Sequence, residues 1–174
     1  MAACNTIKQF TLDHCESNLG GIKKVWLANY VENAAQVGDS TGETESVITG
    51  FTSGVTWFEY EMRKNTASLT STLNVGDEGG AYVTSELAMV FSKMDTPKRL
   101  AVVALAKGEC MALIKDANNK YWFLGMDNPV TTSAGTGETG TAKADPNHYT
   151  VTLVDDSEEY PHEVAANVAP DYQA

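Results

Sequence analysis

Residues 82–124 decide the fold of this chain; they read YVTSELAMVFSKMDTPKRLAVVALAKGECMALIKDANNKYWFL. The stretch predicts a long strand over residues 82–94, a short helix over about residues 96–107, and two strands joined by a turn over residues 110–124. A single helix packed on an otherwise β chain is therefore the frame into which the remaining segments must fit.

The helix is expected from its boundary residues. Thr96 can act as an N-cap, and Pro97 has the backbone φ that a first helical position needs. Gly108 offers a left-handed stop. The apolar stripe is expected at three- and four-residue intervals, at Leu100, Val103, Ala104 and Lys107.

A tight turn is expected over residues 116–120, which read DANNK and lie between two apolar runs. Asn118 and Asn119 tolerate the positive φ that such turns require. The flanking runs therefore pair as an antiparallel hairpin.

The rest of the chain reads as strands separated by polar loops. Phe58, Tyr60 and Met62 alternate with polar residues, as do Leu69, Leu73 and Val75, so each set is expected on a buried face. Strands are predicted over residues 22–30, 47–51, 55–63, 67–75, 149–153 and part of 160–168. Loops are predicted over residues 32–45 and 126–145, and an acidic turn over residues 155–159.

No helix–strand alternation suggests a parallel sheet. The predicted fold class is mainly β, an antiparallel β-sandwich or barrel with one packed helix. The predicted organisation is an irregular arm over residues 1–21, a single domain over residues 22–168 and a frayed tail over residues 169–174.

The long strand has two unlike faces. Val83, Leu87, Met89 and Phe91 form the side expected in the core. The opposite side is also too apolar for open water, so we predict a subunit contact at Tyr82, Thr84, Ala88 and Val90.

Composition restricts the class of protein. The 174 residues carry a formal charge of -11, which argues against a surface that grips nucleic acid. The three cysteines are widely spaced, so we expect neither disulfides nor a zinc site, and Cys110 is expected to be a buried thiol. The N-terminus does not read as a signal peptide, and no apolar run approaches the roughly 20 residues of a membrane helix. We therefore expect a soluble protein made in the cytoplasm.

Residues 135–140, GTGETG, match the dinucleotide-binding pattern GxGxxG in letters only. Such a site needs a helix directly after the glycines, whereas residues 141–146, TAKADP, cannot continue as a helix. Thr141 also stands where a phosphate-binding loop requires Lys. A flexible loop is the preferred interpretation.

No other constellation predicts catalysis. His14, His148 and His162 lack the spacing of a metal face. Asp145, His148 and Asp155 could converge across one turn, but such residues usually only meet water. The acidic residues Asp155, Asp156, Glu158 and Glu159 lack the spacing of a calcium loop. We therefore expect no enzyme activity, cofactor or metal.

The order of elements and several short phrases resemble the tail tube proteins of long-tailed and contractile bacteriophages, which are similar in fold to the ring protein of type VI secretion. The phrases are GGIKKVWL at 20–27, FEYE at 58–61, ELAMVF at 86–91, and IKD at 114–116 running to YWFLG at 121–125. Residues 145–153, DPNHYTVTL, followed by EYP at 159–161 are similar to the closing strands of such virion proteins.

The resemblance implies a hexameric ring that stacks into a tube around a channel for DNA. Acidic side chains on the channel wall would repel phosphate, and Glu59, Glu61 and Glu86 are the candidates. Residues 38–45 and 131–143 would be arms that order on stacking. The partners implied are other copies of the chain and other virion proteins, with DNA only as cargo that does not adhere, no membrane, and a place in the virion.

Two alternatives stay open. The same fold serves as tail terminator, head–tail connector, baseplate hub or capsid decoration, and fold alone does not choose among these roles. A small β-sandwich enzyme or ligand-binding protein, with residues 126–145 as a lid, is the third interpretation.

Overall fold

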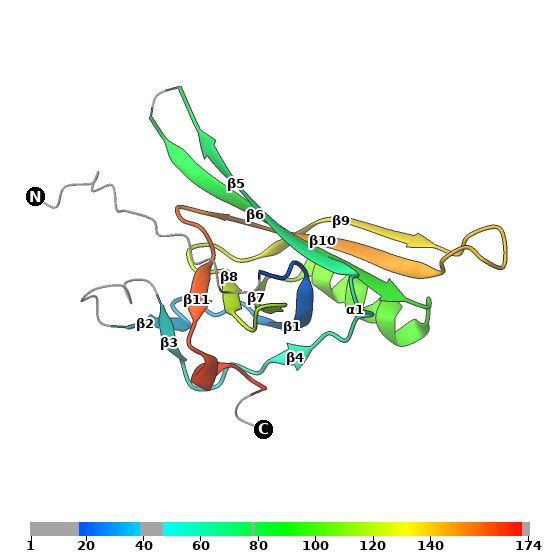
Figure 1. Cartoon of the computed structure of the whole chain (residues 1–174), viewed down its shortest axis with the longest axis horizontal. Helices are drawn as coiled ribbons and strands as arrows, with labels where there is room; N and C mark the ends of the chain where they lie inside the picture. The colour runs from blue at the N-terminus through cyan, green and yellow to red at the C-terminus, as the bar shows by residue number, and fades with distance from the viewer. Residues whose placement is uncertain (1–17, 39–46, 78, 172–174) are drawn as a thin grey trace, which may run out of the picture.

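The computed structural model describes residues 18–38, 47–77 and 79–171, which form two β-sheets and one α-helix (Figure 1). The two sheets are largely antiparallel and pack as a sandwich-like pair. The predicted fold class is confirmed, and of its two forms the sandwich is the one observed, because the sheets do not close into a barrel.

The larger sheet has seven strands in the order β2-β3-β11-β8-β7-β1-β4, and only the β3–β11 pair is parallel. Its strands are β1 (Ile22–Asn29), β2 (Ala35–Val37), β3 (Ile48–Phe51), β4 (Phe58–Glu59), β7 (Cys110–Asp116), β8 (Tyr121–Leu124) and β11 (His162–Val164). A single turn of 3-10 helix, η1 (Ala166–Val168), follows the last strand.

The smaller sheet has four antiparallel strands in the order β5-β6-β10-β9. They are β5 (Ala67–Val75), β6 (Ala81–Ser92), β10 (His148–Ser157) and β9 (Thr131–Glu138). Helix α1 (Thr96–Lys107) contacts β9 and β10, and Thr132 on β9 donates a hydrogen bond to the Leu105 carbonyl at 3.0 Å.

The predicted hairpin over residues 110–124 is confirmed as β7 and β8, and Asp116 organises its turn. Its Oδ1 accepts hydrogen bonds from the backbone amides of Asn118 and Lys120 at 2.8 and 2.9 Å. Its Oδ2 accepts from Trp122 Nε1 at 3.0 Å. Asn119 takes the positive φ of 65° that the sequence predicts.

The predicted helix is also confirmed and ends at Gly108 as expected, but the predicted N-cap and the predicted left-handed conformation of Gly108 are wrong. Asp95, not Thr96, is the N-cap, and its Oδ1 accepts a hydrogen bond from the Lys98 amide at 3.0 Å. The hydrogen bonds from Lys98 lower the pKa of Asp95. Gly108 is extended at φ -102°, so the helix ends without a left-handed residue.

The predicted apolar stripe of the helix faces solvent. Leu100 is 56% exposed and Val103 is 42% exposed. The buried side is one position further round the helix, where Leu105 enters the core and Val102 packs against it. The sequence pattern is ambiguous here because apolar residues occupy both sides of the helix.

Three predicted loop or strand segments need correction. The loop over residues 32–45 contains the short strand β2, while its residues 39–45 lie outside the described part of the chain. The loop over residues 126–145 contains the eight-residue strand β9. The strand over residues 55–63 is reduced to the two residues of β4, and Phe58 is 57% exposed instead of buried.

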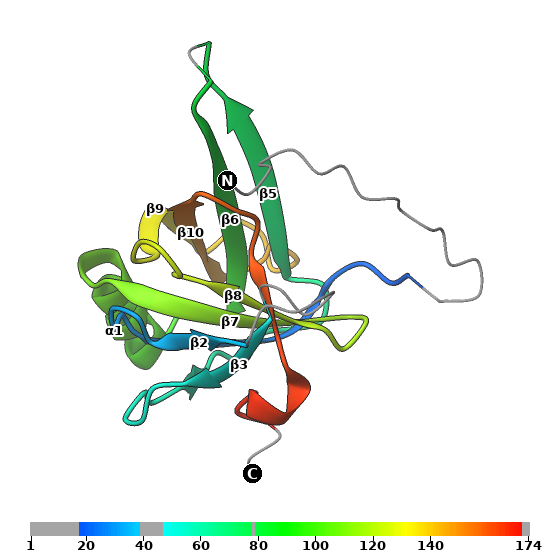
Figure 2. The ribbon, with the colours of Figure 1, turned by 90° about the vertical axis from the view of Figure 1, so that its left-hand side faces the viewer.

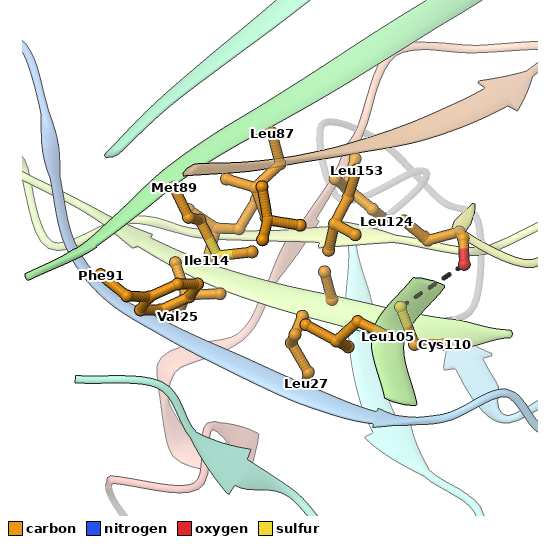
Figure 3. Close-up of a cluster of buried hydrophobic side chains, with 13 residues drawn as sticks. Val25, Leu27, Leu87, Met89, Phe91, Leu105, Cys110, Ile114, Leu124 and Leu153 are labelled. Carbon is orange, nitrogen blue, oxygen red and sulfur yellow. Dashed lines mark hydrogen bonds between the residues drawn. The ribbon is translucent and has the colours of Figure 1, made fainter. Parts of the chain in front are cut away.

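The main core lies between the two sheets (Figure 3). Val25, Leu27 and Ile114 come from the larger sheet, and Leu87 and Leu153 come from the smaller one, with Leu105 of the helix at one end. Cys110 is buried at that end as predicted, and its Sγ donates to the Val130 carbonyl at 3.4 Å, the dashed line in Figure 3.

A second core covers the opposite side of the larger sheet. Alternate residues of its central strands, among them Trp26, Leu113 and Phe123, pack there against the chain that leads to the C-terminus. Ala169 is fully buried, and Asp171 accepts hydrogen bonds from Lys115 and Tyr121 at 2.7 and 2.9 Å. The prediction of a frayed tail is therefore wrong for residues 169–171.

The distal part of the β5–β6 hairpin projects beyond the body of the molecule (Figures 1 and 2). Leu73 and Val75 were expected on a buried face, but they are 48% and 71% exposed. The larger sheet does not extend under this part of the hairpin, so alternation alone does not bury these side chains.

Candidate assembly surface

The smaller sheet turns one broad face away from the core, and we name this the outer face. Cross-strand partners lie on the same side of a sheet, so the register defines its members. They are Ser68, Thr70, Thr72 and Asn74 on β5; Tyr82, Thr84, Glu86, Ala88, Val90 and Ser92 on β6; His148, Thr150, Thr152, Val154 and Asp156 on β10; and Thr131, Ala134, Thr136 and Glu138 on β9.

The outer face has a distinctive charge pattern. None of the four strands of this sheet contains Lys or Arg, whereas the strands of the larger sheet include Lys23, Lys24 and Lys115. The charged side chains on the outer face are carboxylates, at Glu86, Glu138 and Asp156, set in a field of threonines. Such a surface repels the phosphates of nucleic acid.

Side-chain hydrogen bonds tie three strands of the outer face together. Thr84 Oγ1 donates to Asp156 Oδ1 at 2.7 Å, and Asn74 Nδ2 donates to Thr84 Oγ1 at 3.2 Å. These bonds join β5, β6 and β10 near the point where the hairpin leaves the body. The acidic group at Asp156 is therefore held in place.

Among the described strands, β5 pairs only with β6 and β9 pairs only with β10, so neither edge of this sheet is paired with a further strand; helix α1 contacts β9. The Val90 amide donates to the Thr66 carbonyl at 2.9 Å, so residues 66 and 90 form a hydrogen-bonded pair. Such pairs alternate along an antiparallel ladder. The backbone groups of residues 67, 69, 71 and 73 therefore point away from β6, toward the free edge.

The structure does not bring the three predicted channel residues together. Glu86 lies on the outer face. Glu59 pairs with Trp26 on the opposite side of the sandwich, and its carboxylate forms an ion pair with Lys24 Nζ at 3.2 Å. Glu61 is exposed in the connection after β4. Of the three, only Glu86 belongs to the outer face.

The predicted subunit-contact residues share the outer face with Glu86. Tyr82 is half exposed, and Thr84, Ala88 and Val90 are half-buried within the sheet surface. One face therefore carries residues for which the sequence predicts two different roles.

Two acidic members of the outer face escape the sequence analysis. Asp156 is predicted in an acidic turn, but β10 continues to Ser157 and alternation places Asp156 outward. Glu138 is predicted in a loop, but it pairs with His148 at the end of β9. The signal for Asp156 is present in the sequence. If the alternation of Tyr149, Val151 and Leu153 is continued to residue 155, residue 156 is predicted on the outward side of the strand.

The other candidate chemistry does not assemble. Gly135 and Gly137 lie within β9, and no helix follows them. Asp145 closes its own loop, since its Oδ2 accepts from the amides of Thr141 and Ala142. His148 faces outward and Asp155 inward on the same strand, so Asp145, His148 and Asp155 do not converge.

Cys110 and Asp155 are the buried titratable groups of interest. Burial raises the pKa of the Cys110 thiol to about 11, which makes it a poor nucleophile at neutral pH. Burial also raises the pKa of Asp155 to about 6. Gly125 donates its amide to Asp155 Oδ2 at 3.2 Å, while Oδ1 is buried without a hydrogen-bond partner.

Within the described ranges, no group of three or more His, Cys, Asp or Glu side chains is arranged to hold a metal ion. The described helices include none long and apolar enough to cross a bilayer. No protein-family model, curated protein or solved structure matches the chain.

Proposed function

We propose that this chain is a structural virion protein that assembles into rings of six copies, which stack as a phage tail tube around a channel for DNA. The observation that carries the proposal is the outer face, a sheet surface with threonines and carboxylates and no Lys or Arg in its strands. DNA carries one negative charge per phosphate, so it would pass such a wall without adhering.

The open edges supply the means of assembly. Free strand edges favour pairing with another chain, and β5 and β9 are long edges at opposite sides of the same sheet. Pairing β5 of one copy with β9 of the next is a head-to-tail contact, and such contacts close into rings when the rotation allows. A ring built this way would place all outer faces on one continuous wall.

This arrangement assigns one role to the outer face. The channel would be lined by Glu86, Glu138 and Asp156. Neighbouring copies would contact one another through the strand edges, and not through the face that the sequence predicts. Tyr82, Thr84, Ala88 and Val90 would then also line the wall, because they share its side of β6. Glu59 and Glu61 would lie on the outside of the tube or at its ends.

A second role, as a head–tail connector, tail terminator or capsid-decorating protein, is favoured by the exposed helix side. Leu100 and Val103 are apolar and exposed on α1. Exposed apolar residues at helical spacing suit a contact with a different virion protein. In either role the protein would be made in the bacterial cytoplasm and reside in the virion.

Edge pairing is tested by replacing Leu73 on β5. Its amide points to the free edge, so Leu73→Pro removes one edge donor and leaves the β5–β6 ladder intact. We expect light scattering to show loss of the assembled species that the unmodified protein forms at high concentration.

The matched control is Leu73→Thr, which removes the same apolar side chain but keeps the backbone amide. It should assemble as the unmodified protein does. If both variants assemble equally well, edge pairing through β5 is excluded; if both fail, the side chain and not the edge makes the contact.

A further inference from the structure

A cleft of about 630 Å³ lies at the end of the smaller sheet where β6 ends and β10 begins. It is bordered by the end of β6, the start of β10, the connection before β5 and the loop before His148. Val90, Ala144 and Pro146 supply apolar wall, and the polar lining is Arg63, Thr66, Ser92, Lys93, Asp145, Asn147 and His148. The volume is that of a small-molecule site.

Two cations line this cleft. Among the described residues, neither Arg63 nor Lys93 has an ion-pair partner, whereas Lys24, Lys98 and Lys115 each pair with a carboxylate. Other described cations, such as Arg99 and Lys107, also lack an ion pair; what distinguishes Arg63 and Lys93 is that both line one cleft. They place two positive charges at one end of an acidic face, where Glu138 is the cross-strand neighbour of His148.

Asp145 is the one carboxylate that lines the cleft, and its hydrogen bonds go to residues of the loop that contains it. Asp145 Oδ2 accepts from the amides of Thr141 and Ala142 at 2.7 Å each, and from Thr141 Oγ1 at 3.1 Å. These hydrogen bonds, first from Ala142 and then from Thr141, lower the pKa of Asp145. Asp145 therefore shapes the rim and does not pair with the two cations.

His148 has unused hydrogen-bonding capacity. Its Nδ1 is shielded from solvent and has no hydrogen-bond partner among the described residues. Polar atoms that are buried without a partner are rare, and each requires an explanation such as an absent ligand or water. The ring stands beside Ser92, its cross-strand partner, at the floor of the cleft.

Lys93 occupies a position that favours glycine or asparagine. Its φ is 67°, and its backbone is clamped because its amide donates to the Asn147 carbonyl at 2.7 Å and its carbonyl accepts from Lys98 Nζ at 3.1 Å. Strained residues of this kind cluster at binding sites. Here the clamp fixes the point from which the lysine side chain leaves the chain.

We propose that this cleft is a phosphate-binding site. Arg63 offers a planar fork of N–H donors, Lys93 a point charge, and His148 with Ser92 further donors, which together match the oxygens of a phosphoryl group. Val90 and Pro146 would contact the organic part of a phosphate ester. The proposal does not require that the chain forms tubes. Because Val90, Ser92 and His148 also belong to the outer face, the site would lie in a tube at one end of the channel wall, away from Asp156 at the other end of β10.

The test uses the full-length protein and inorganic phosphate, titrated by calorimetry at constant ionic strength against a chloride reference. We expect saturable binding that Arg63→Gln and Lys93→Gly each weaken about tenfold, since each removes a charge-assisted contact. Lys93→Gly suits the positive φ, so this variant should keep or raise its melting temperature. Arg99→Gln, on the exposed side of α1 outside the cleft, is the matched control.

A second arm identifies the source of the phosphate. A short DNA duplex that competes with inorganic phosphate, and loses affinity in the same two variants, would assign the site to phosphodiesters; a duplex that does not compete would assign it to small phosphates. The proposal is overturned if phosphate fails to bind, or if Arg99→Gln weakens binding as much as Arg63→Gln does. Equal binding of acetate would also overturn it.

Discussion

Asp155 is a carboxyl group placed inside the main core region on the inner side of β10. It is 3% exposed and lies opposite Ser85, and only its Oδ2 has a hydrogen-bond donor, the Gly125 amide. Burial raises its pKa from 3.8 to about 6, because the ionised form loses its hydration. At neutral pH this residue therefore destabilises the fold.

The pH range of that penalty follows from the pKa in the two states. Because the pKa of Asp155 in the folded protein exceeds the unfolded value of 3.8, Asp155 keeps its proton to a higher pH in the folded protein than in the unfolded chain. Stability then falls as pH rises from about 4 to about 6 and stays reduced above that range, by about 3 kcal/mol in total.

Asp155→Asn should remove this pH dependence. The amide oxygen can still accept from Gly125, and no charge needs to be buried. Urea unfolding at pH 4.5 and at pH 7.5 gives the difference in free energy of unfolding between the variant and the unmodified protein at each pH. We expect this difference to favour the variant by about 2 kcal/mol more at pH 7.5 than at pH 4.5.

The control for this experiment is Glu138→Gln, an exposed carboxylate on β9. Glu138 pairs with His148 at the opposite end of β10 from Asp155, so its replacement removes one carboxylate without changing the burial of Asp155. An equal response of both variants would contradict the assignment of the penalty to burial.

At the scale of elements, the helix offers a direct comparison of two neighbouring residues. Asp95 accepts from the Lys98 amide at 3.0 Å, and the Thr96 side chain makes no capping bond. Asp95→Ala should lower the free energy of unfolding by about 1 kcal/mol, and Thr96→Ala should change it by much less. Thermal unfolding of the two variants checks this, and the reverse order would contradict the observed cap.

Local signals explain which elements the sequence predicts well. The helix and the β7–β8 hairpin are recognised because Pro97 and the turn residues around Asp116 specify backbone conformation through their own chemistry. Strand β9 is missed because its residues, TTSAGTGE, are those of a loop by composition. It is a strand because β10 supplies a ladder of partners, and partners distant in sequence are not visible in a local pattern.

Burial along the β5–β6 hairpin shows the same limit. Val83, Leu87, Met89 and Phe91 are buried as predicted, whereas Leu73 and Val75 alternate equally well and are exposed. What differs is whether the opposing sheet reaches that far, which is a property of the whole fold. The outer face could therefore be predicted from β6 alone, but its members on β9 and its edges could not.

At the scale of the whole molecule, the proposed channel is defined by the sign of its charge. Glu86→Lys places a cation at the centre of the outer face, so assembled protein should retain duplex DNA at low salt and release it as salt rises. Filter binding or co-sedimentation measures this. Retention is not expected for the unmodified protein.

Glu59→Lys is the matched control, since it makes the same charge change on the opposite side of the sandwich. It loses only a surface ion pair with Lys24, which contributes little to stability. Equal DNA retention by both lysine variants would show that the outer face has no special position in the assembly.

The central claim is that copies of this chain form rings whose outer faces enclose a channel. Negative-stain electron microscopy of the concentrated protein at low salt, with light scattering for mass, tests it most directly. The account predicts rings or stacked tubes with a central channel. A uniform monomer under all conditions would contradict it and would leave the connector or decorating role, which requires a second virion protein, as the function to pursue.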